Sequence, residues 1–294
     1  MNRALRRGVS MSWRRRALAL ALVSFSLNTA IASGEESQTL VRADGAQVPV
    51  RVYGVAANSC RGIAVLSPGA GGTEKGLSYL AKALSKDGWL SVVVGHKESG
   101  PAAFRADMQG LGVRDALLRL TTDRSAYEAR LMDIGAALDW ARPRCDKHFS
   151  ALIGHSMGAA TVMLEAGAAN KLNLTGKDRF DAYVAMSPQG PGSIFPEHAW
   201  SKIGKPVLML TGTGDKALEG EWTTRTVPYD DMPAGCKWLG VIDGATHMNF
   251  GGKGMSRKTE KLTIHATQTF LDALAAGGSC AMLAEEDGIK FKHK

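Results

Sequence analysis

The stretch ALIGHSMGAA, residues 151–160, decides the fold expected for this chain. A short apolar run leads into Gly-x-Ser-x-Gly, with glycine two positions before and two positions after Ser156. A buried strand that passes directly into a helix crowds the backbone around such a serine, and the glycines relieve that crowding. The pattern predicts a strand–turn–helix unit that lifts the Ser156 hydroxyl above the carboxyl edge of a sheet. The alternative is a small-residue turn without chemistry.

Apolar runs and helical patterns alternate along the chain on both sides of this unit. An opening hairpin around Asp44-Gly45 is expected over residues 39–53. Continuous apolar runs typical of buried strands occupy residues 62–67, 90–95, 150–154, 182–186, 207–211 and 237–242. Helical spacing of apolar residues occupies residues 74–86, 127–142, 159–169 and 256–275. The alternation predicts an α/β fold, with a mainly parallel twisted sheet and helices on both faces.

Two segments do not fit this alternation. Residues 96–126 combine Gly100-Pro101, mixed charges and one weak helical patch at residues 113–120. Because long loops are uncommon unless they have a function, we expect a lid over a site, with a solvated excursion as the alternative. Residues 285–294 are expected to be a flexible tail. The rest of residues 33–294 is expected to form one α/β domain.

The first 32 residues have the composition of a secretory signal peptide. Six arginines and no acidic residue in this segment account for most of the net charge of +8. An apolar stretch from Ala17 to Leu27 follows, and then Ala30-Ile31-Ala32, with small residues where a signal peptidase cleaves. We expect removal of residues 1–32 and export to the periplasm or the outside. A retained membrane anchor is the alternative, and no second candidate span follows.

The part of the chain after the signal peptide is nearly neutral, which argues against nucleic-acid binding. Ser156 instead indicates a catalytic site with two further residues, because a serine nucleophile needs a base to take its proton and an acid to orient that base. In this topology both follow later strands, in the order acid and then histidine. Asp215 follows the strand at residues 207–211, and His247 follows the strand at residues 237–242. Glu219 is a weaker candidate for the acid.

Acyl chemistry also needs backbone donors for a developing oxyanion. The N–H of Met157 directly follows the serine, and the glycine-rich turn at residues 67–72 offers the N–H of Ala70. Gly71 in the same turn, His96 after a strand and His155 beside the serine are expected to line the substrate pocket.

These motifs resemble those of serine hydrolases of the α/β-hydrolase superfamily. The resemblance is carried by Ser-Pro-Gly-Ala-Gly-Gly (67–72), Gly-His-Ser-Met-Gly (154–158), Gly-Thr-Gly-Asp (212–215) and Gly-Ala-Thr-His (244–247). Within the superfamily the chain is most similar to dienelactone-hydrolase-like proteins and to bacterial cutinase-like esterases. The resemblance implies two-step acyl transfer, in which Ser156 attacks an ester carbonyl, His247 is the base and Asp215 orients it.

Departures from these families refine the expected substrate. Dienelactone hydrolases use a cysteine nucleophile, whereas this chain has Ser156. Cutinase-like polyester hydrolases carry aromatic residues at the positions of Ala70 and Gln189. With Gln189 as a pocket residue instead, a small or medium-sized soluble ester is the expected partner. The same chemistry needs no cofactor and no metal, and the sequence does not indicate an oligomeric state.

The fold implied by the resemblance also pairs the cysteines. Cys60 and Cys145 precede two strands that are neighbours in that fold, and Cys236 precedes the last strand, beside the helix that Cys280 follows. We therefore expect disulfides Cys60–Cys145 and Cys236–Cys280, which export permits. Two other functions stay open: an acyltransferase with the same triad, and a non-catalytic binding protein on this scaffold.

Overall fold

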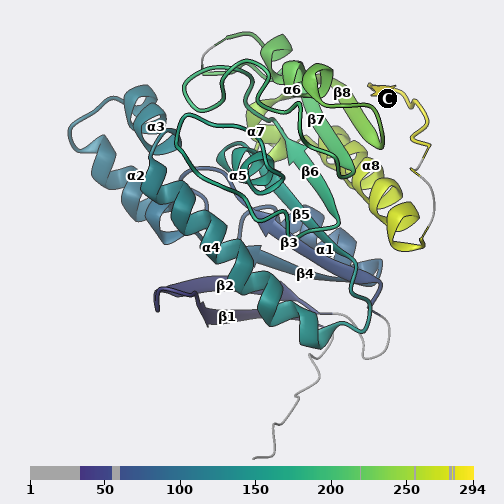
Figure 1. The fold of residues 1–294 in the computed structure, drawn as a ribbon, viewed down its shortest axis with the longest axis horizontal. Coiled ribbons are helices and arrows are strands. Elements are labelled where there is room, and N and C mark those ends of the chain that lie inside the picture. Colours follow the sequence, from purple (N-terminus) through teal and green to yellow (C-terminus); the bar gives the residue numbers. More distant parts are fainter. Residues whose placement is uncertain (1–33, 55–59, 219, 255, 278–279, 281) are drawn as a thin grey trace, which may run out of the picture.

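The computed structural model describes residues 34–54, 60–218, 220–254, 256–277, 280 and 282–294. The expected signal peptide, residues 1–32, lies outside the described residues. Within them, a nine-stranded sheet has the order β1-β2-β4-β3-β5-β6-β7-β8-β9 (Figure 1). The strands are Glu35–Val41 (β1), Gln47–Tyr53 (β2), Gly62–Ser67 (β3), Trp89–Val94 (β4), Ser150–His155 (β5), Ala182–Met186 (β6), Val207–Gly214 (β7), Lys237–Thr246 (β8) and Ile289–His293 (β9).

The centre of the sheet is parallel, as the sequence predicts. Strands β4, β3, β5, β6, β7 and β8 run parallel to one another, whereas the β1–β2 hairpin and β9 add antiparallel strands at the two edges. The strand order reverses between β3 and β5, because β4 lies on one side of β3 and β5 on the other. In open α/β sheets, ligands bind outside the carboxyl ends of the strands at such a point. Ser67 at the end of β3 pairs with Gly154 of β5, so the turns that follow them are neighbours.

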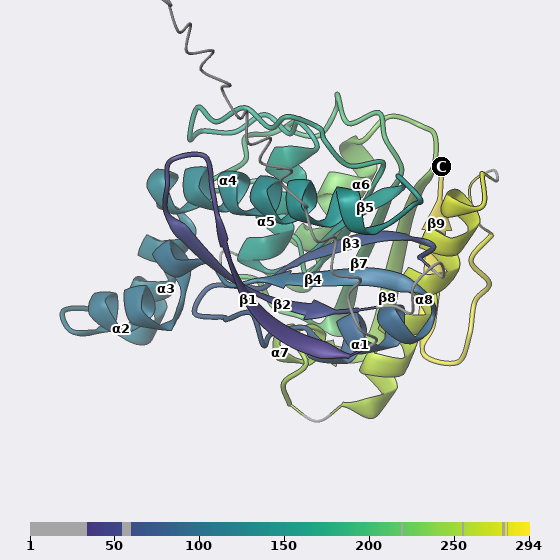
Figure 2. The same cartoon turned by 90° about the horizontal axis from the view of Figure 1, so that it is seen from below.

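Helices cover both faces of the sheet. Figure 2 shows α4 and α5 on one face and α1 and α8 on the other. Because successive side chains of a strand point to opposite faces, Ile63 and Val65 join the core under α4 and α5, and Ala64 and Leu66 join the core over α1 and α8. The α-helices are Ser78–Lys86 (α1), Pro101–Met108 (α2), Val113–Thr121 (α3), Arg124–Ala141 (α4), Met157–Glu165 (α5), Val227–Asp231 (α6), His247–Phe250 (α7) and Arg257–Ala275 (α8). Short 3₁₀ helices occupy Lys97–Ser99 (η1), Arg142–Arg144 (η2) and Trp222–Thr226 (η3).

Helices α1 and α4 begin several residues away from the positions expected from the apolar spacing. Helix α1 begins at Ser78 rather than at Glu74, because Leu77 adopts a left-handed backbone conformation with φ of 54° and ends the preceding turn. Helix α4 begins three residues before Tyr127. There the Asp123 side chain accepts hydrogen bonds from the backbone N–H groups of Ser125 and Ala126, which caps the helix.

Residues 96–126 are more regular than the sequence indicates. Helix α3 matches the weak helical patch, but α2, with Pro101 as its first residue, is an additional helix. Proline is favoured at this position because its missing N–H is not needed there and its φ is already helical. The α2–α3 pair stands out at the side of the molecule in both ribbon views (Figures 1 and 2).

The expectation of a flexible tail at residues 285–294 is wrong. Residues Ile289–His293 form β9, which pairs antiparallel with β8 from Trp238 to Ile242. The Ile289 side chain is buried, and Phe291 packs edge-on against Trp238. The short segment Ile-Lys-Phe-Lys-His alternates apolar and basic residues, which suits an edge strand with one face against the core.

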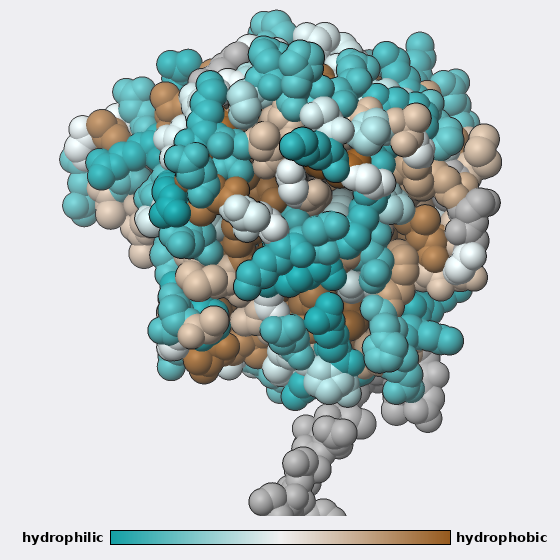
Figure 3. Space-filling model, viewed as in Figure 1, coloured by the Kyte–Doolittle hydropathy of each residue, from teal (hydrophilic) through white to brown (hydrophobic). Residues whose placement is uncertain are grey.

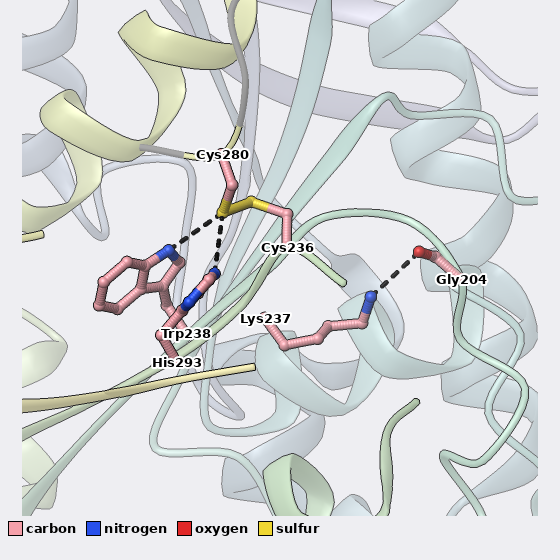
Figure 4. Close-up of a disulfide and its surroundings, with 6 residues drawn as sticks. All are labelled: Gly204, Cys236, Lys237, Trp238, Cys280 and His293. Atoms are coloured by element: carbon pink, nitrogen blue, oxygen red, sulfur yellow. Dashed lines mark hydrogen bonds between the residues drawn. A yellow bond between two sulfur atoms is a disulfide. The ribbon is translucent and has the colours of Figure 1, made fainter. Parts of the chain in front are cut away.

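Both expected disulfides are present, Cys60–Cys145 and Cys236–Cys280. The first joins the entries of β3 and β5. The second joins the entry of β8 to the segment after α8. Figure 4 shows the second disulfide beside the Trp238 indole, whose N–H lies 3.1 Å from the Cys280 sulfur. Both disulfides therefore lie at the amino edge of the parallel strands, opposite the edge where Ser156 is found.

On the face shown in Figure 3, hydrophilic residues predominate and the hydrophobic residues between them form small separate patches. Among the residues that the structure describes, we find no helix that combines the length and the apolar character needed to cross a membrane.

Candidate active site

Ser156 occupies a strained turn between β5 and α5. Its backbone has φ of 56° and ψ of −118°, a conformation that non-glycine residues rarely adopt. A side chain on Gly154 would collide with the backbone of Gly158, and one on Gly158 would collide with the carbonyl oxygen of Ser67. The two glycines are therefore required for the chain to pass through this turn.

Ser156, His247 and Asp215 form a chain of hydrogen bonds. Ser156 Oγ lies 2.9 Å from His247 Nε2, and His247 Nδ1 lies 2.9 Å from Asp215 Oδ1. Asp215 is fully buried, and Thr211 of β7 donates to its second oxygen at 3.0 Å. His247 is the first residue of α7, which begins directly after β8. The three residues thus come from the carboxyl ends of β5, β7 and β8, while Glu219 lies outside the described residues.

The buried side chain of Arg225 also belongs to this cluster. Its Nε lies 3.0 Å from Asp215 Oδ1, and its Nη2 lies 3.1 Å from His247 Nδ1. The same guanidinium donates to four backbone carbonyls, those of Asp215, Ser187, Pro188 and Lys216. Sequence reasoning missed Arg225, since a lone arginine in a polar loop carries no pattern that separates it from a solvated side chain.

The charges around Asp215 favour its ionised form. Burial alone would raise the pKa of this carboxyl group, but the hydrogen bond from His247 and the positive charge of Arg225 outweigh burial and hold the pKa below its ordinary value. An ionised carboxylate accepts hydrogen bonds only, so the proton between Asp215 and His247 is on Nδ1. His247 Nε2 is then free to accept the Ser156 hydroxyl proton.

His155 supports His247 from the other side. Its Nε2 lies 2.9 Å from the His247 carbonyl oxygen, and the two rings are 4.8 Å apart. Burial, together with the neighbouring His247, lowers the pKa of His155 to about 3. The ring is therefore neutral near pH 7, and its Nε2–H donates to the carbonyl.

The two residues with the predicted oxyanion donors both lie close to Ser156. Ala70 lines the cavity in front of the serine, and Met157 follows it as the first residue of α5. Within the part of the chain that the structure describes, neither backbone N–H donates to a protein oxygen. The turn approaches the serine closely, since a Cβ on Gly69 would lie 3.2 Å from Ser156 Cβ.

The cavity in front of Ser156 has a volume of about 450 Å³. Ser156, His247 and three of the expected pocket residues, Gly71, His155 and Gln189, line it. Helices α2 and α3 contribute apolar walls. The largest apolar side chains around the cavity are Leu77, Phe104, Leu117, Leu118, Ile194, Leu218 and Met248.

His96 does not line this cavity, contrary to the sequence-based expectation. Its side chain is buried behind the turn at residues 67–72, and both ring nitrogens are occupied. Nε2 lies 2.8 Å from Ser67 Oγ, and Nδ1 lies 2.9 Å from Asp133 Oδ2. These two partners draw the ring inward, away from the substrate side.

A wider hollow of about 900 Å³ lies between the β1–β2 hairpin and α4. None of Ser156, Asp215 and His247 lines it, so the smaller cavity is the candidate active site. Among the described residues, no group of three or more His, Cys, Asp or Glu side chains is arranged to hold a metal ion.

Comparison with known proteins supports the architecture. No protein-family model and no curated protein sequence matches the chain. Among solved structures, a PEG-bound cold-adapted esterase from an Arctic intertidal metagenomic library matches with a TM-score of 0.57. The match has 18% sequence identity and covers 79% of this chain and 93% of that chain. This likeness and the sheet topology establish an α/β-hydrolase fold.

Proposed function

We propose that this protein is a serine esterase, with Ser156 as nucleophile, His247 as general base and Asp215 as the orienting acid. The observation that carries the proposal is the unbroken chain of hydrogen bonds from Ser156 through His247 to buried Asp215, with 2.9 Å between each pair of atoms. That the solved structure of similar fold is described as an esterase agrees with this assignment.

The reaction proceeds by acyl transfer in two steps. Ser156 Oγ bonds to the ester carbonyl carbon while His247 Nε2 accepts its proton. The tetrahedral adduct then expels the alkoxide, which takes that proton from His247 and leaves as the alcohol. In the second step water attacks the acyl carbon while His247 accepts the proton of the water; the adduct then breaks its bond to Ser156 Oγ, which takes that proton from His247, and the carboxylic acid departs.

The oxyanion of each tetrahedral adduct binds to the backbone N–H groups of Ala70 and Met157. Both groups are without a protein acceptor among the described residues; Met157 directly follows Ser156, and Ala70 lines the same cavity as Ser156. Donors fixed in advance around a developing charge are worth far more than donors in water, because they need no reorganisation. The N-terminus of α5 adds a favourable dipole to the Met157 N–H.

The cavity suits an ester of small or medium size with an apolar acyl or alcohol part. Its volume of about 450 Å³ lies toward the lower end of the range for small-molecule sites. The walls that α2 and α3 contribute are apolar, which favours burial of a hydrocarbon chain. The α2–α3 pair, as part of the segment at residues 96–126, acts as the lid of this cavity.

The disulfides support the proposed export of the protein. Disulfide bonds form and persist in oxidising compartments such as the periplasm and the cell exterior. Cys60–Cys145 and Cys236–Cys280 account for every cysteine in the chain. The assignment to the dienelactone-hydrolase-like or cutinase-like branch stays a prediction from the motifs.

Hydrolysis of a short-chain nitrophenyl ester tests the proposed function. Replacement of Ser156 by Ala should lower the turnover of this ester by about 10⁵- to 10⁶-fold, because loss of the nucleophile disables the triad as a unit. Ser201→Ala is the matched control, since Ser201 is an exposed serine whose hydroxyl donates to the His198 carbonyl oxygen in its own loop. It should keep wild-type turnover.

A fluorophosphonate probe gives a second, independent readout. The probe should add covalently to Ser156 of the wild-type protein and leave the Ser156→Ala variant unmodified, as seen by mass spectrometry. A loss of less than tenfold in Ser156→Ala would reject the proposed nucleophile. A wild-type protein that neither hydrolyses esters nor reacts with the probe would favour a non-catalytic role.

A further inference from the structure

A buried arginine lies directly behind the turn that carries the Ala70 N–H. Arg130 of α4 is only 1% exposed, and its guanidinium donates to Pro68 O at 2.9 Å and to Ser67 Oγ at 3.2 Å. A second nitrogen, Nη2, lies 3.4 Å from Gly69 O. The Arg130 side chain thus contacts three consecutive residues of the turn, all from the side opposite to the cavity.

The same arginine fixes the far end of the turn through Ser99. Arg130 Nε donates to Ser99 Oγ at 2.8 Å, and the Ser99 carbonyl oxygen accepts the N–H of Gly71 at 2.8 Å. Ser99 is fully buried in η1. Both ends of the segment from Ser67 to Gly71 are therefore held by one buried cation and its partners.

A buried Ser–His–Asp set completes the support at Ser67. Burial, and next the positive charge of Arg130, lower the pKa of His96 to about 4, so the ring is neutral near pH 7. Its Nδ1–H donates to Asp133, and its Nε2 accepts the Ser67 hydroxyl. The Ser67 oxygen is then left to accept from Arg130. Because Ser67 is fully buried, this set does not meet a substrate.

The geometry of the peptide unit connects this support to the oxyanion site. The carbonyl of Gly69 and the N–H of Ala70 belong to one planar trans peptide, in which they point in opposite directions. The Gly69 oxygen accepts the N–H of Gly72 at 3.0 Å in addition to its contact with Arg130. With the carbonyl held inward, the Ala70 N–H must point outward, toward the cavity that Ala70 and Ser156 line.

We propose that Arg130 is a positioning residue for the oxyanion hole. It holds the carbonyls of Pro68 and Gly69 so that the Ala70 N–H is fixed toward the oxyanion, and its charge polarises the peptide that donates. This inference rests on the proposed ester hydrolysis at Ser156. The competing view is that Arg130 only satisfies buried carbonyls and joins α4 to β3.

Steady-state kinetics normalised to active sites separates these two roles. The variant Arg130→Lys keeps the charge but loses the planar fork that reaches several acceptors at once. Active sites are counted from the burst of nitrophenol or from fluorophosphonate labelling, so unfolded molecules do not enter the rate. We expect kcat per active site to fall by about 10- to 100-fold with KM changed less than about threefold, because oxyanion donors act mainly on the transition state.

A trifluoromethyl ketone inhibitor provides a second test, because its inhibition constant would not change if the role of Arg130 were purely structural. Its adduct with Ser156 places an oxyanion where the transition state has one, so its inhibition constant should rise by the same factor by which kcat/KM falls. Ser67→Ala, which removes one contact of Arg130 and little volume, should show the same pattern with a smaller factor. Arg124→Lys is the control on the same helix, because Arg124 is exposed and its hydrogen bonds go to Leu172 and Glu128.

The outcomes distinguish this inference from the proposed function. Arg130→Lys with wild-type kcat per active site and an unchanged inhibition constant overturns the inference alone. A lower burst amplitude with an unchanged rate per site shows a purely structural role and overturns it as well. A wild-type protein without a burst and without Ser156 labelling overturns the proposed function, and the positioning role falls with it.

Discussion

A single arginine connects the loops around the proposed triad. Arg225 is 3% exposed and donates to backbone carbonyls in the loops after β6 and β7, while its Nε contacts Asp215 and its Nη2 lies next to His247. A buried charge is tolerated when it is paired and its donors are satisfied. Arg225 meets both conditions and thereby fixes the position of the Asp215 carboxylate.

Replacement of Arg225 by Gln should lower kcat by about 10- to 100-fold, because a small displacement of a catalytic group is costly. It should also make the protein more sensitive to acid. The pKa of Asp215 is held below its ordinary value in the folded protein, so its contribution to stability is complete above the unfolded pKa and is lost as the pH falls through the folded value. Without the charge of Arg225 the folded pKa of Asp215 rises toward its unfolded value, so the carboxylate contributes less stability and the protein reaches its acid transition at a higher pH.

Circular dichroism followed from pH 7 to pH 2, with activity assays at pH 7, checks this prediction. Arg142→Gln is the control, since Arg142 is half exposed and forms an ion pair with exposed Asp139. The acid transition of Arg225→Gln should move to higher pH while that of Arg142→Gln stays with the wild type. Unchanged kcat and an unchanged acid midpoint would remove Arg225 from the site.

The contacts of Ser156, Asp215 and His247 could be predicted from sequence because each residue follows an apolar strand run. Parallel strands bring their carboxyl ends to one edge, so order along the chain determines which side chains meet there. The positions of Arg225, Arg130 and His96 could not be predicted in this way. Their partners are backbone carbonyls and side chains far along the chain, such as Asp133 for His96, and no local period marks them.

At the scale of elements, α2 and α3 contribute apolar walls to the cavity of the proposed active site. They follow β4 through η1 and place Phe104, Leu117 and Leu118 on the wall of the cavity. The sequence indicated the insertion but only one of its helices. The helix that the sequence did not indicate is α2. It has no buried residue, so it lacks the apolar spacing from which a helix is recognised.

Replacement of Leu117 by Trp should shift the preference of the enzyme toward shorter acyl chains. The larger side chain fills part of the cavity, so kcat/KM for an octanoyl nitrophenyl ester should fall by about tenfold or more, as expected for lost space in an apolar pocket. The acetyl ester should stay within about twofold of wild type, since it occupies less of the same pocket. Both values come from parallel assays.

Val113→Trp is the matched control on the same helix. Val113 is 57% exposed and does not belong to the residues around the cavity. It should leave both esters unaffected. An equal loss for both esters in Leu117→Trp would mean that the substitution disturbs the triad rather than the acyl pocket.

The strand β9 could not be predicted from the composition of its segment. Residues 285–294 are rich in charge, and the segment expected to be a tail contains only two large apolar side chains, Ile289 and Phe291, two positions apart. Period-two alternation over so short a stretch is a weak signal for a strand. These residues form a strand because they pair with β8, which satisfies backbone groups along the edge of β8 and covers Trp238.

Ile289→Ala should lower the free energy of unfolding by about 2–4 kcal/mol, because Ile289 is 3% exposed and its removal leaves a cavity. Lys290→Ala, on the outward face of the same strand, should stay within about 0.5 kcal/mol of wild type. Urea denaturation followed by tryptophan fluorescence measures both variants. Equal, negligible effects would show that β9 contributes nothing to stability in solution.

At the scale of the whole molecule, the proposed active site and the disulfides lie at opposite edges of the sheet. The proposed triad residues lie at the carboxyl ends of β5, β7 and β8, whereas Cys60, Cys145 and Cys236 precede β3, β5 and β8. The topology of the sheet makes this separation predictable from sequence, since the same strand has its cysteine at one end and its functional residue at the other. Stability and chemistry can therefore be altered separately.

Removal of either disulfide should destabilise the protein without changing turnover per active site. The bridges span 85 and 44 residues, and closing such loops in the unfolded chain gives a typical stabilisation of about 2–4 kcal/mol each. Because the entropic cost of a loop grows with the logarithm of its length, Cys60→Ala/Cys145→Ala should lose more than Cys236→Ala/Cys280→Ala, by about 0.6 kcal/mol. Urea denaturation of both variants, with burst-normalised kcat at 25 °C, measures the two effects independently. A parallel fall in kcat would show that strain at the amino edge reaches Ser156 through the strands. Four alkylatable thiols in the untreated, exported protein would contradict both the disulfide pairing and the oxidising compartment.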